Sequence, residues 1–232
     1  MAPQPVVLIL GAGPRVGAAV AAAFKSKGYS VAIASRSGTG AKTSEGYLSL
    51  AADFANPSSI PPLFDSVKET FGAAPSVVVY NAASLTLPPD NDSVLSIPAE
   101  RVVHDLNVNT VSAYVAAQKS VEGWATLPGD VKKTFIYTGN PLNVRVAPVP
   151  LFLNLGVGKR ASTYWIAVAD ETYTAKGYRF HYADERAEGG KGKGPNLDGP
   201  AHGEFYTQLA SHEGSIPWHA TFVAGEGYGK FD

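Results

Sequence analysis

Short runs of apolar residues alternate along this chain with longer segments that carry apolar residues on one side only. The short runs are apolar almost throughout, which is typical of parallel strands covered on both faces. They predict strands over residues 6–10, 30–35, 47–51, 76–80, 133–138 and 178–183, and an edge strand over residues 220–224. The one-sided segments predict helices over residues 16–27, 58–71, 101–124, 159–176 and 201–211.

The order of these elements sets the expected fold class. Strand and helix take turns from residue 6 onward, which predicts an α/β fold: a Rossmann-type, doubly wound parallel sheet of about seven strands in three layers. The 232 residues, 45% of them hydrophobic, suffice for one sizeable core, so we expect a single domain over residues 1–232. Residues 187–199 are rich in glycine and lysine and predict a mobile loop over a substrate.

A glycine-rich turn follows the first predicted strand and opens the first helix. Gly11, Gly13 and Gly17 stand in the spacing G-x-G-x-x-x-G, with Arg15 and Val16 before the last glycine. Glycine permits a tight turn and a close approach to a ligand, and the free N–H groups of a helix's first turn attract phosphate. The turn therefore predicts the pyrophosphate site of a dinucleotide-binding domain, and a plain structural turn is the alternative.

The end of the second strand indicates which nucleotide is preferred. Ser35 and Arg36 stand there, where a dinucleotide-binding unit faces the adenosine ribose. An acidic residue would favour NAD, whereas arginine offers hydrogen-bond donors to a 2′-phosphate. Arg36, with Arg15 as a second cation, predicts NADP(H); a solvated arginine is the alternative. After the third strand, Asp53, followed by Phe54, could accept a hydrogen bond from the adenine amino group or begin the next helix.

Composition and charge narrow the classes of partner. With 19 basic and 20 acidic residues the formal net charge is −1, so nothing favours nucleic acid or a membrane surface, and we expect a small-molecule substrate. The chain has no cysteine, which excludes disulfides and thiolate metal sites. The first apolar run is too short for a membrane span and follows no basic leader, so we expect a cytoplasmic protein. The histidines lack metal-site spacing, and no G-x-S-x-G elbow predicts a hydrolase.

The order and spacing of these features resemble the short-chain dehydrogenase/reductase family over residues 5–182. Residues 11–17 are similar to the family's glycine motif, with Arg15 at its middle glycine, and residues 81–83 (Asn-Ala-Ala) are similar to its Asn-Ala-Gly element. Residues 106–109 (Leu-Asn-Val-Asn) are similar to the helix that carries its active-site asparagine, which we assign to Asn107. The resemblance implies nucleotide contacts at Gly11, Gly13, Arg15, Val16, Gly17, Ser35, Arg36, Asp53, Phe54, Asn81, Ala82 and Lys159.

The catalytic positions implied by this resemblance are only partly filled. The family's serine corresponds to Asn140, and its Tyr-x-x-x-Lys motif corresponds to Leu155 and Lys159. In the family the tyrosine is the general acid and the lysine lowers its pKa, but leucine cannot transfer a proton. The resemblance thus implies Asn107, Asn140 and Lys159 as the catalytic set. Lys159 would hold the nicotinamide ribose, and Asn140 could orient a substrate carbonyl or be a satisfied amide at a strand end.

Two tyrosines could replace the missing acid. Tyr164 lies five residues beyond Lys159, which places it about 140° around a helix and makes it a poor substitute. Tyr137, on the fifth strand near Asn140, is the better candidate, although a strand tyrosine more often belongs to the core.

Three charged residues follow the sixth strand, where the resemblance implies a Pro-Gly pair beside the nicotinamide. Asp184, Glu185 and Arg186 stand there instead. Charges at the carboxyl end of a strand could be groups of the site or the start of a solvated loop. The residues alone leave both interpretations open.

Three functions fit these observations. The first is an NADPH-dependent reductase of a small, activated substrate, which retention of Lys159 favours. The others, favoured by the loss of the tyrosine, are an NADP-binding sensor or scaffold without redox activity and a non-redox enzyme, such as a cyclase or isomerase, that reuses the nicotinamide cavity. Apolar positions on the helix over residues 101–124 predict packing on the sheet or on a second subunit, and the resemblance implies a homodimer or homotetramer.

Overall fold

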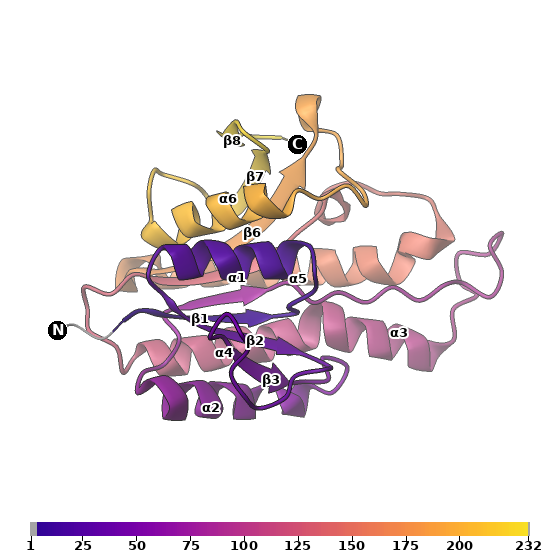
Figure 1. Cartoon of the computed structure of the whole chain (residues 1–232). Coiled ribbons are helices and arrows are strands. Elements are labelled where there is room, and N and C mark those ends of the chain that lie inside the picture. Colours follow the sequence, from indigo (N-terminus) through magenta and orange to yellow (C-terminus); the bar gives the residue numbers. More distant parts are fainter. Residues whose placement is uncertain (1–3, 232) are drawn as a thin grey trace.

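One sheet runs through the centre of the computed structural model, which describes residues 4–231 (Figure 1). Its strand order is β3-β2-β1-β4-β5-β6-β7-β8, and every neighbouring pair is parallel except β7 with β8. The strands are β1 Val6–Leu10, β2 Ser30–Ser35, β3 Leu48–Ala51, β4 Val77–Tyr80, β5 Lys133–Thr138, β6 Tyr178–Arg186, β7 His219–Val223 and β8 Gly227–Tyr228. The chain winds outward from β1 to β3 on one side and to β7 on the other.

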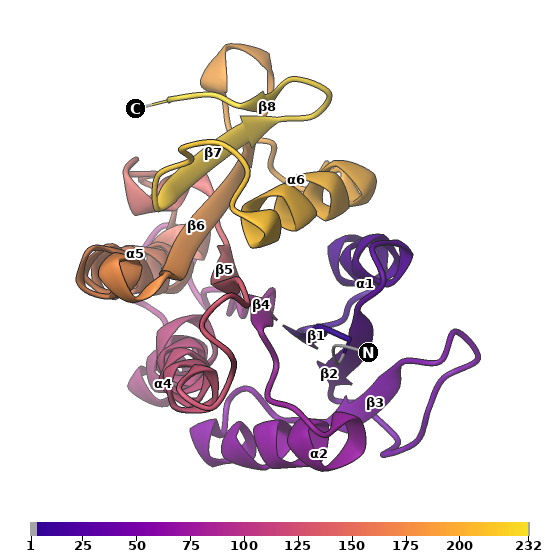
Figure 2. The same ribbon diagram turned by 90° about the vertical axis from the view of Figure 1, so that its left-hand side faces the viewer.

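Helices cover both faces of the sheet. Figure 2 shows α1 and α6 on one face and α2, α4 and α5 on the other. Their bounds are α1 Val16–Ser26, α2 Pro61–Phe71, α3 Ala99–Leu106, α4 Ser112–Trp124, α5 Leu153–Tyr173 and α6 Gly199–Ser211. The predicted three-layer α/β fold is therefore confirmed, with β1 to β7 as the parallel strands and β8 as an antiparallel addition.

Two apolar cores lie between these layers. Every side chain of β1 and β4 is buried, which explains why their sequences show no polar alternation. On the α2–α4–α5 face, the rings of Tyr80, Tyr137 and Tyr182 stack across β4, β5 and β6 with centroids 5.7 and 5.6 Å apart. On the other face, Phe24 of α1 and Phe205 of α6 belong to the second core. This tight packing holds the strand ends in fixed positions.

The helix predicted over residues 101–124 is continuous but carries a wide turn in its middle. Residues Asn107–Val111 form a π-helical turn between α3 and α4. A π turn widens the helix locally and is common near functional sites. Here the carbonyl oxygens of Val108 and Asn109 accept hydrogen bonds from the hydroxyls of Tyr80 and Tyr137, both at 2.6 Å. The turn thus ties this helix to the tyrosine stack.

Several element bounds differ from the sequence prediction, and the largest difference is at α5, which begins at Leu153 rather than near residue 159. Strand β6 continues to Arg186 because β7 pairs with its last residues, for example Asp184 with Thr221. Helix α2 begins at Pro61 rather than near residue 58, because Asn56 accepts a hydrogen bond from the Ser58 amide and caps a separate short 3-10 turn. The parallel strands all end at the same edge of the sheet, and in such folds ligands bind outside that edge where the strand order reverses, here between β1 and β4.

Candidate functional site

The glycine turn after β1 has three glycines with three different surroundings. Gly11 has a φ of 95°, and a side chain there would overlap the main chain of Ala82. A Cβ at Gly17 would lie 2.7 Å from the Cα of Ala12, whereas one at Gly13 would meet nothing within 4 Å. Gly11 and Gly17 therefore allow close packing, and Gly13 leaves the backbone open to a ligand, as pyrophosphate sites require.

The end of β4 locks this turn in place. Asn81 donates its side-chain amide to the carbonyl of Gly11 at 2.8 Å, and the amides of Asn81 and Ala82 both reach the carbonyl of Leu10. Helix α1 begins directly after the turn with no side-chain cap, so no side chain takes the N–H groups of its first turn, which suits an anion. The Val16 side chain is buried, which leaves only its backbone for a ligand.

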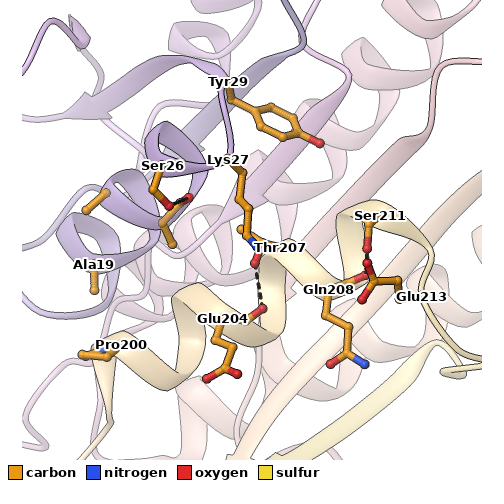
Figure 3. A pocket seen from close by; sticks show the side chains of 12 residues that line it. Ala19, Ser26, Lys27, Tyr29, Pro200, Glu204, Thr207, Gln208, Ser211 and Glu213 are labelled. Atoms are coloured by element: carbon orange, nitrogen blue, oxygen red, sulfur yellow. Dashed lines mark hydrogen bonds between the residues drawn. The ribbon is translucent and has the colours of Figure 1, made fainter.

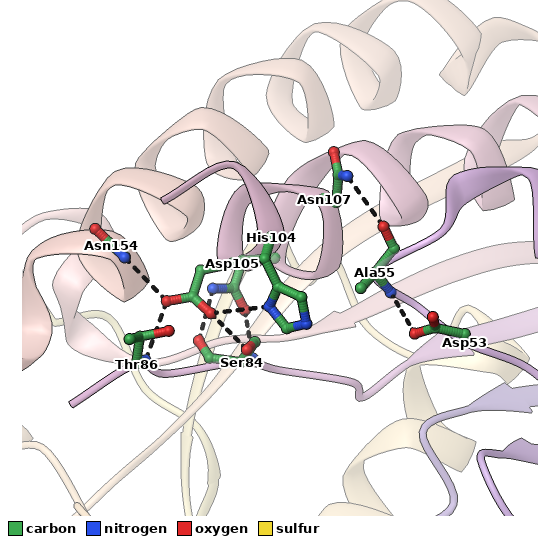
Figure 4. A network of polar contacts seen from close by, with 9 residues as sticks. Asp53, Ala55, Ser84, Thr86, His104, Asp105, Asn107 and Asn154 are labelled. Carbon is green, nitrogen blue, oxygen red and sulfur yellow. Dashed lines mark hydrogen bonds and ion pairs between the residues drawn. The ribbon is translucent and has the colours of Figure 1, made fainter. Parts of the chain in front are cut away.

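Four predicted nucleotide contacts lie at the ends of β2 and β3. Arg36 is exposed, and the hydroxyl of Ser35 lies 3.3 Å from that of Ser37. Asp53 is exposed and accepts a hydrogen bond from the amide of Ala55 at 3.0 Å (Figure 4). The Phe54 side chain is buried in the core, so any nucleotide contact of Phe54 would involve its backbone.

Arg15 lies at the start of α1 and reaches across the edge of the sheet. Its guanidinium donates a hydrogen bond to the carbonyl of Pro195, in the loop over residues 187–199. In the same loop Lys193 lies 3.1 Å from the carboxylate of Glu185, and a Cβ at Gly192 would lie 2.8 Å from Pro141. The loop thus rests on the carboxyl edge of the sheet, as a cover for a ligand would; its mobility stays a prediction.

A cavity of about 590 Å³ lies beneath this loop, at the carboxyl ends of β4, β5 and β6. It has polar groups from three strands and one helix and an apolar wall from α5 and the neighbouring turns. The polar or charged residues of its lining are Asn81, Thr138, Asn140, Lys159, Asp184, Glu185 and Lys193. Its apolar wall includes Leu142, Phe152, Leu155 and Leu197. The structure therefore brings together Asn81, Asn140 and Lys159, which the sequence had placed in one site.

A second, more open hollow of about 1010 Å³ lies between α1 and α6 (Figure 3). The hydroxyls on its walls bond within their own helices: Ser26 to Ala23 and Thr207 to Glu204. Exposed side chains that are already bonded locally do not form a preorganised site. The cavity at the strand ends is therefore the candidate site.

Lys159 is the buried cation of this cavity. Its Nζ donates to the carbonyl of Thr138 at 2.8 Å and lies 4.4 Å from the centroid of the Tyr137 ring. Burial lowers the pKa of Lys159 to about 7, against the opposing effect of the nearby Asp184 carboxylate. The ammonium has three hydrogens, one of which bonds to Thr138, so the others can serve a ligand in the cavity.

Asn140 is held firmly at the end of β5. The hydroxyl of Tyr182 accepts from its main-chain amide at 3.0 Å and donates to its carbonyl at 2.8 Å. Its side-chain oxygen accepts from the amide of Leu142 at 3.0 Å and so begins a short 3-10 turn. From the sequence, Asn140 is expected either to orient a substrate or to be a satisfied amide. Its side-chain oxygen is satisfied, and its side-chain nitrogen can still donate to a ligand.

The two tyrosines considered as proton donors lie outside the cavity. Tyr137 is fully buried, its hydroxyl donates to the carbonyl of Asn109 at 2.6 Å, and burial raises its pKa well above the ordinary value. Tyr164 is 76% exposed on the outer side of α5. The suggestion that Tyr137 replaces the missing acid is therefore wrong, because its hydroxyl neither lines the cavity nor has a proton to spare.

Asn107, assigned from the sequence as the active-site asparagine, does not line the cavity either. Its side chain donates to the carbonyl of Ala55 at 3.0 Å, toward the segment after β3 (Figure 4). Asn109 is the asparagine on the other side of the π turn. It is fully buried, exchanges two hydrogen bonds with the main chain of Ser84, and packs against Gly158, one residue before Lys159. The assignment therefore fits Asn109 better than Asn107.

A buried carboxylate that the sequence analysis missed connects three segments around the site. Asp105 accepts hydrogen bonds from the Ser84 hydroxyl at 2.6 Å, the Thr86 amide at 3.0 Å and the Asn154 side chain at 2.9 Å (Figure 4). Together with a contact from His104, these bonds lower its pKa against the effect of burial. Asp105 thus fixes the start of α5 and the segment after β4. A lone Asp in an amphipathic helix gives no signal of such a role.

The charged residues at the end of β6 are buried, so they do not begin a solvated loop. Asp184, Glu185 and Arg186 are exposed by 0%, 2% and 0%. Arg186 donates to the Asp184 carboxylate at 2.6 Å and to the carbonyl of Gly190 at 3.0 Å. Glu185 accepts from the amide of Asp198 at 2.8 Å. Two of these groups, Asp184 and Glu185, line the cavity.

Comparison with known proteins places the chain in a family. It is 38% identical over 241 aligned positions to a protein of Cryptosporiopsis sp. (strain 8999) described as short chain dehydrogenase/reductase dmxR12, covering 98% of this chain and 95% of that one. The chain belongs to the short-chain dehydrogenase/reductase family. No family model matches the sequence. The resemblance of the motifs is therefore confirmed at the level of the family, whose members are oxidoreductases that use a nicotinamide nucleotide.

Several solved structures share the fold. A double-mutant short-chain dehydrogenase/reductase from Serratia marcescens has a TM-score of 0.77 at 19% identity, covering 97% of this chain and 99% of that one. An NADH-dependent reductase, A1-R′, described as responsible for alginate metabolism, has a TM-score of 0.78 at 15% identity, covering 96% and 97%. A short-chain type dehydrogenase/reductase from Mycobacterium marinum has a TM-score of 0.76 at 16% identity, covering 95% and 93%.

Residues 4–231 contain neither a membrane-spanning helix nor a cluster of metal ligands. No helix among them is long and apolar enough to cross a membrane. No group of three or more His, Cys, Asp or Glu residues among them could hold a metal ion.

Proposed function

We propose that this protein is an NADPH-dependent reductase of a small, electron-poor organic acceptor. The observation that carries the proposal is the position of Lys159: a buried ammonium in the wall of a cavity at the strand edge where the glycine turn opens. Burying an ammonium is unfavourable unless its charge or its hydrogens are used. A protein that only bound a partner on its surface would have little physical need for it there.

The residues present fit a nicotinamide nucleotide. The open backbone at Gly13 and the uncapped start of α1 suit the pyrophosphate, and Asp53 is exposed after β3, where we expect the adenine. Lys159 would hold the hydroxyls of the nicotinamide ribose, and Asn109 would stabilise the π turn beside the cavity. A bound reduced nicotinamide supplies hydride; the protein supplies position and charge.

The preference for NADPH rests on Arg36. Its guanidinium is exposed at the end of β2, where it can form charge-assisted hydrogen bonds with a 2′-phosphate. The nearest residues, Ser35 and Ser37, add hydroxyls and no carboxylate that would favour a free 2′-hydroxyl. Arg15 is a second cation beside the same turn, although its guanidinium also bonds to Pro195.

The substrate contacts we propose are polar on one side and apolar on the other. The side-chain nitrogen of Asn140 can donate to a substrate oxygen, while Leu142, Phe152 and Leu155 offer an apolar wall. Leu155 stands where the family has its tyrosine acid and cannot protonate a substrate. An acceptor whose product anion is already stabilised is therefore favoured, because loss of a general acid slows ordinary ketones by about 10²–10⁴-fold.

The lack of a proton donor at Leu155 also favours a second candidate function. A pocket without the usual acid could serve a non-redox enzyme, such as a cyclase or isomerase, or a nucleotide sensor. Such a protein would bind NADPH and leave every acceptor unreduced. Lys159 would then affect nucleotide affinity at most, and no turnover of NADPH would depend on it.

The test combines nucleotide binding with turnover. NADPH and NADH are titrated into the protein, and NADPH consumption is followed with quinones, α-dicarbonyls, imines and enones. We expect turnover of at least one electron-poor acceptor and its loss in Lys159→Met. Lys133→Met is the matched control, since Lys133 is also buried and bonds to main-chain carbonyls, but at the opposite end of β5. Bound NADPH without turnover of any acceptor would contradict the proposal.

A further inference from the structure

The carboxyl group of Asp184 has an unusual position among the buried groups of the cavity. Asp184 lines the cavity and is itself 0% exposed. Its Oδ2 accepts a hydrogen bond from the Nε of Arg186 at 2.6 Å. Its Oδ1 is buried and has no hydrogen-bond partner among the described residues. A buried carboxyl oxygen left unpaired at a cavity wall is unfavourable unless it carries a proton or meets a ligand.

The surroundings of Asp184 allow it to carry that proton near neutral pH. Burial raises the pKa of Asp184 to about 6, and the nearby charges of Arg186, Lys159 and Arg145 oppose this rise. The other titratable groups facing it are the hydroxyls of Tyr182 and Tyr206, whose pKa values burial raises well above the ordinary range. Both hydroxyls therefore stay neutral, which leaves the Asp184 carboxyl and the Lys159 ammonium as the groups beside the cavity that can gain and lose a proton near neutral pH.

The hydroxyls around the cavity are committed to other acceptors. Tyr137 donates to the carbonyl of Asn109, Tyr182 to the carbonyl of Asn140, and Tyr206 to the hydroxyl of Thr138 at 2.9 Å. None of these three tyrosines lines the cavity. Lys159 does line it and is the rival acid, although one of its hydrogens already bonds to Thr138.

We infer that Asp184 is a catalytic residue that supplies the proton in the reduction proposed above, in place of the acid that Leu155 cannot be. The inference rests on the proposed function. When hydride from the nucleotide reaches a carbonyl carbon, the C=O π bond breaks and its electron pair moves to oxygen. The O–H bond of the Asp184 carboxyl then breaks, and a new O–H bond forms on the substrate. The carboxylate that remains keeps its hydrogen bond with Arg186 and takes a proton back from water.

Two acceptors separate the proton step from hydride transfer. Reduction of an α-keto ester gives an alkoxide that needs a proton, whereas an ortho-quinone gives a phenolate that is stable without one. In Asp184→Asn we expect kcat/KM for the keto ester at pH 6 to fall by at least about 100-fold and that for the quinone by less than about 10-fold. Asparagine keeps an oxygen that can accept from Arg186, so the fold is retained.

The pH dependence of kcat/KM tests the proton donor independently. Because the donor must be protonated, kcat/KM of the wild type for the keto ester falls as pH rises through about 6. Asp184→Asn loses this limb. Asp170→Asn is the matched control: Asp170 is a buried aspartate of α5 that binds Arg179 of β6 at 2.8 Å, and it does not line the cavity. This control keeps the limb.

A readout without turnover follows the proton itself. In protein carrying ¹³C-labelled aspartate, the carboxyl signal that disappears in Asp184→Asn is expected to titrate near pH 6, and Lys159→Met raises that midpoint because a nearby cation is lost.

The outcomes distinguish the claim that Asp184 donates the proton from the claim that the protein is a reductase. If the wild type reduces both acceptors and Asp184→Asn keeps their ratio and the pH limb, Asp184 is not the donor, whereas the proposed function stands. If Lys159→Met changes the ratio and Asp184→Asn does not, the acid is Lys159. If the wild type binds NADPH and reduces neither acceptor, the proposed function is contradicted together with the proton step. A carboxyl signal that titrates near pH 4 also overturns the inference.

Discussion

The hydroxyl of Tyr137 donates to the main-chain carbonyl of Asn109 at 2.6 Å, and this bond joins β5 to the π turn between α3 and α4. The same carbonyl accepts a second hydrogen bond, from the Ser162 hydroxyl on α5, at 2.9 Å. One oxygen atom thus connects a strand and two helices around the cavity. Tyr137 therefore helps to hold β5, the π turn and α5 together around Lys159.

Removing this hydroxyl tests that role. Tyr137→Phe deletes one of the two bonds to Asn109 and should lower the free energy of unfolding by about 1 kcal/mol, since Ser162 still satisfies the carbonyl. Urea denaturation measures this change. We expect kcat for the preferred acceptor to change less than about 10-fold. A loss near 10³-fold in a stably folded variant would instead identify Tyr137 as a proton donor.

Arg36 should determine the choice of nucleotide. Charge-assisted hydrogen bonds contribute about 1.5–3 kcal/mol each, so Arg36→Ala should weaken NADPH binding by about 10–100-fold and leave NADH binding nearly unchanged. Fluorescence titration of both nucleotides measures the two affinities. Lys42→Ala, which removes an exposed cation from the neighbouring loop, is the control and should change neither. Equal affinity of the wild type for NADH and NADPH would contradict the prediction.

Restoring a tyrosine tests whether Leu155 limits the chemistry. Leu155 lines the cavity one helical turn before Lys159, so Leu155→Tyr places a hydroxyl near that ammonium. We expect reduction of unactivated ketones to rise by about 10-fold or more where the cavity accepts the ring. Leu155→Phe fills the same space without a hydroxyl and should give no rise. Equal rates in the two variants would show that the acid at this position is irrelevant.

The buried ammonium of Lys159 should make stability depend on pH. Because its pKa in the folded state is lowered to about 7 from an ordinary value of 10.5, the unfolded chain binds a proton that the folded protein lacks between these pH values. The free energy of unfolding of the wild type should therefore gain on that of Lys159→Met as pH rises from 8 to 10. The gain is at most about 1.4 kcal/mol per pH unit. Urea denaturation at three pH values measures it, and a constant difference would contradict it.

Self-association is expected on the face of α4 and α5. Tyr114 and Val168 are exposed by 53% and 49% there, and the Tyr114 ring lies 5.9 Å from that of the half-buried Trp165. Apolar groups gathered on neighbouring helices favour a second copy of the chain. Light scattering should find a dimer or tetramer for the wild type and a smaller species for Val168→Glu. A monomeric wild type at micromolar concentration would contradict this expectation.

The sequence predicts the sheet well because its signals are local. The strands over residues 6–10 and 30–35 and the turn at Gly11 follow from apolar runs and glycine spacing, which need no knowledge of distant residues. The contacts of the loop over residues 187–199 with Arg15 and Pro141 have no such local signal, because these partners lie far away in sequence.

The errors at the site have a common physical cause. Asn107 and Asn109 lie two residues apart, so they face nearly opposite sides of a helix, and only the position of that helix on the sheet decides which one meets α5. Likewise, the sequence leaves Asp184 and Arg186 either as groups of the site or as the start of a solvated loop, and their pairing with β7 decides between the two. Both outcomes depend on tertiary neighbours, which a local pattern does not contain.

The most direct test of the central claim follows the hydride. NADPH carrying deuterium in place of both C4 hydrogens of the nicotinamide is mixed with the protein and an α-diketone, and the product is analysed by mass spectrometry. The proposal predicts an α-hydroxyketone carrying one deuterium on its carbinol carbon, formed by the wild type and not by Lys159→Met. Unlabelled product, or no reduction of this or any other electron-poor acceptor by protein saturated with NADPH, would contradict a reductase and favour the non-redox functions.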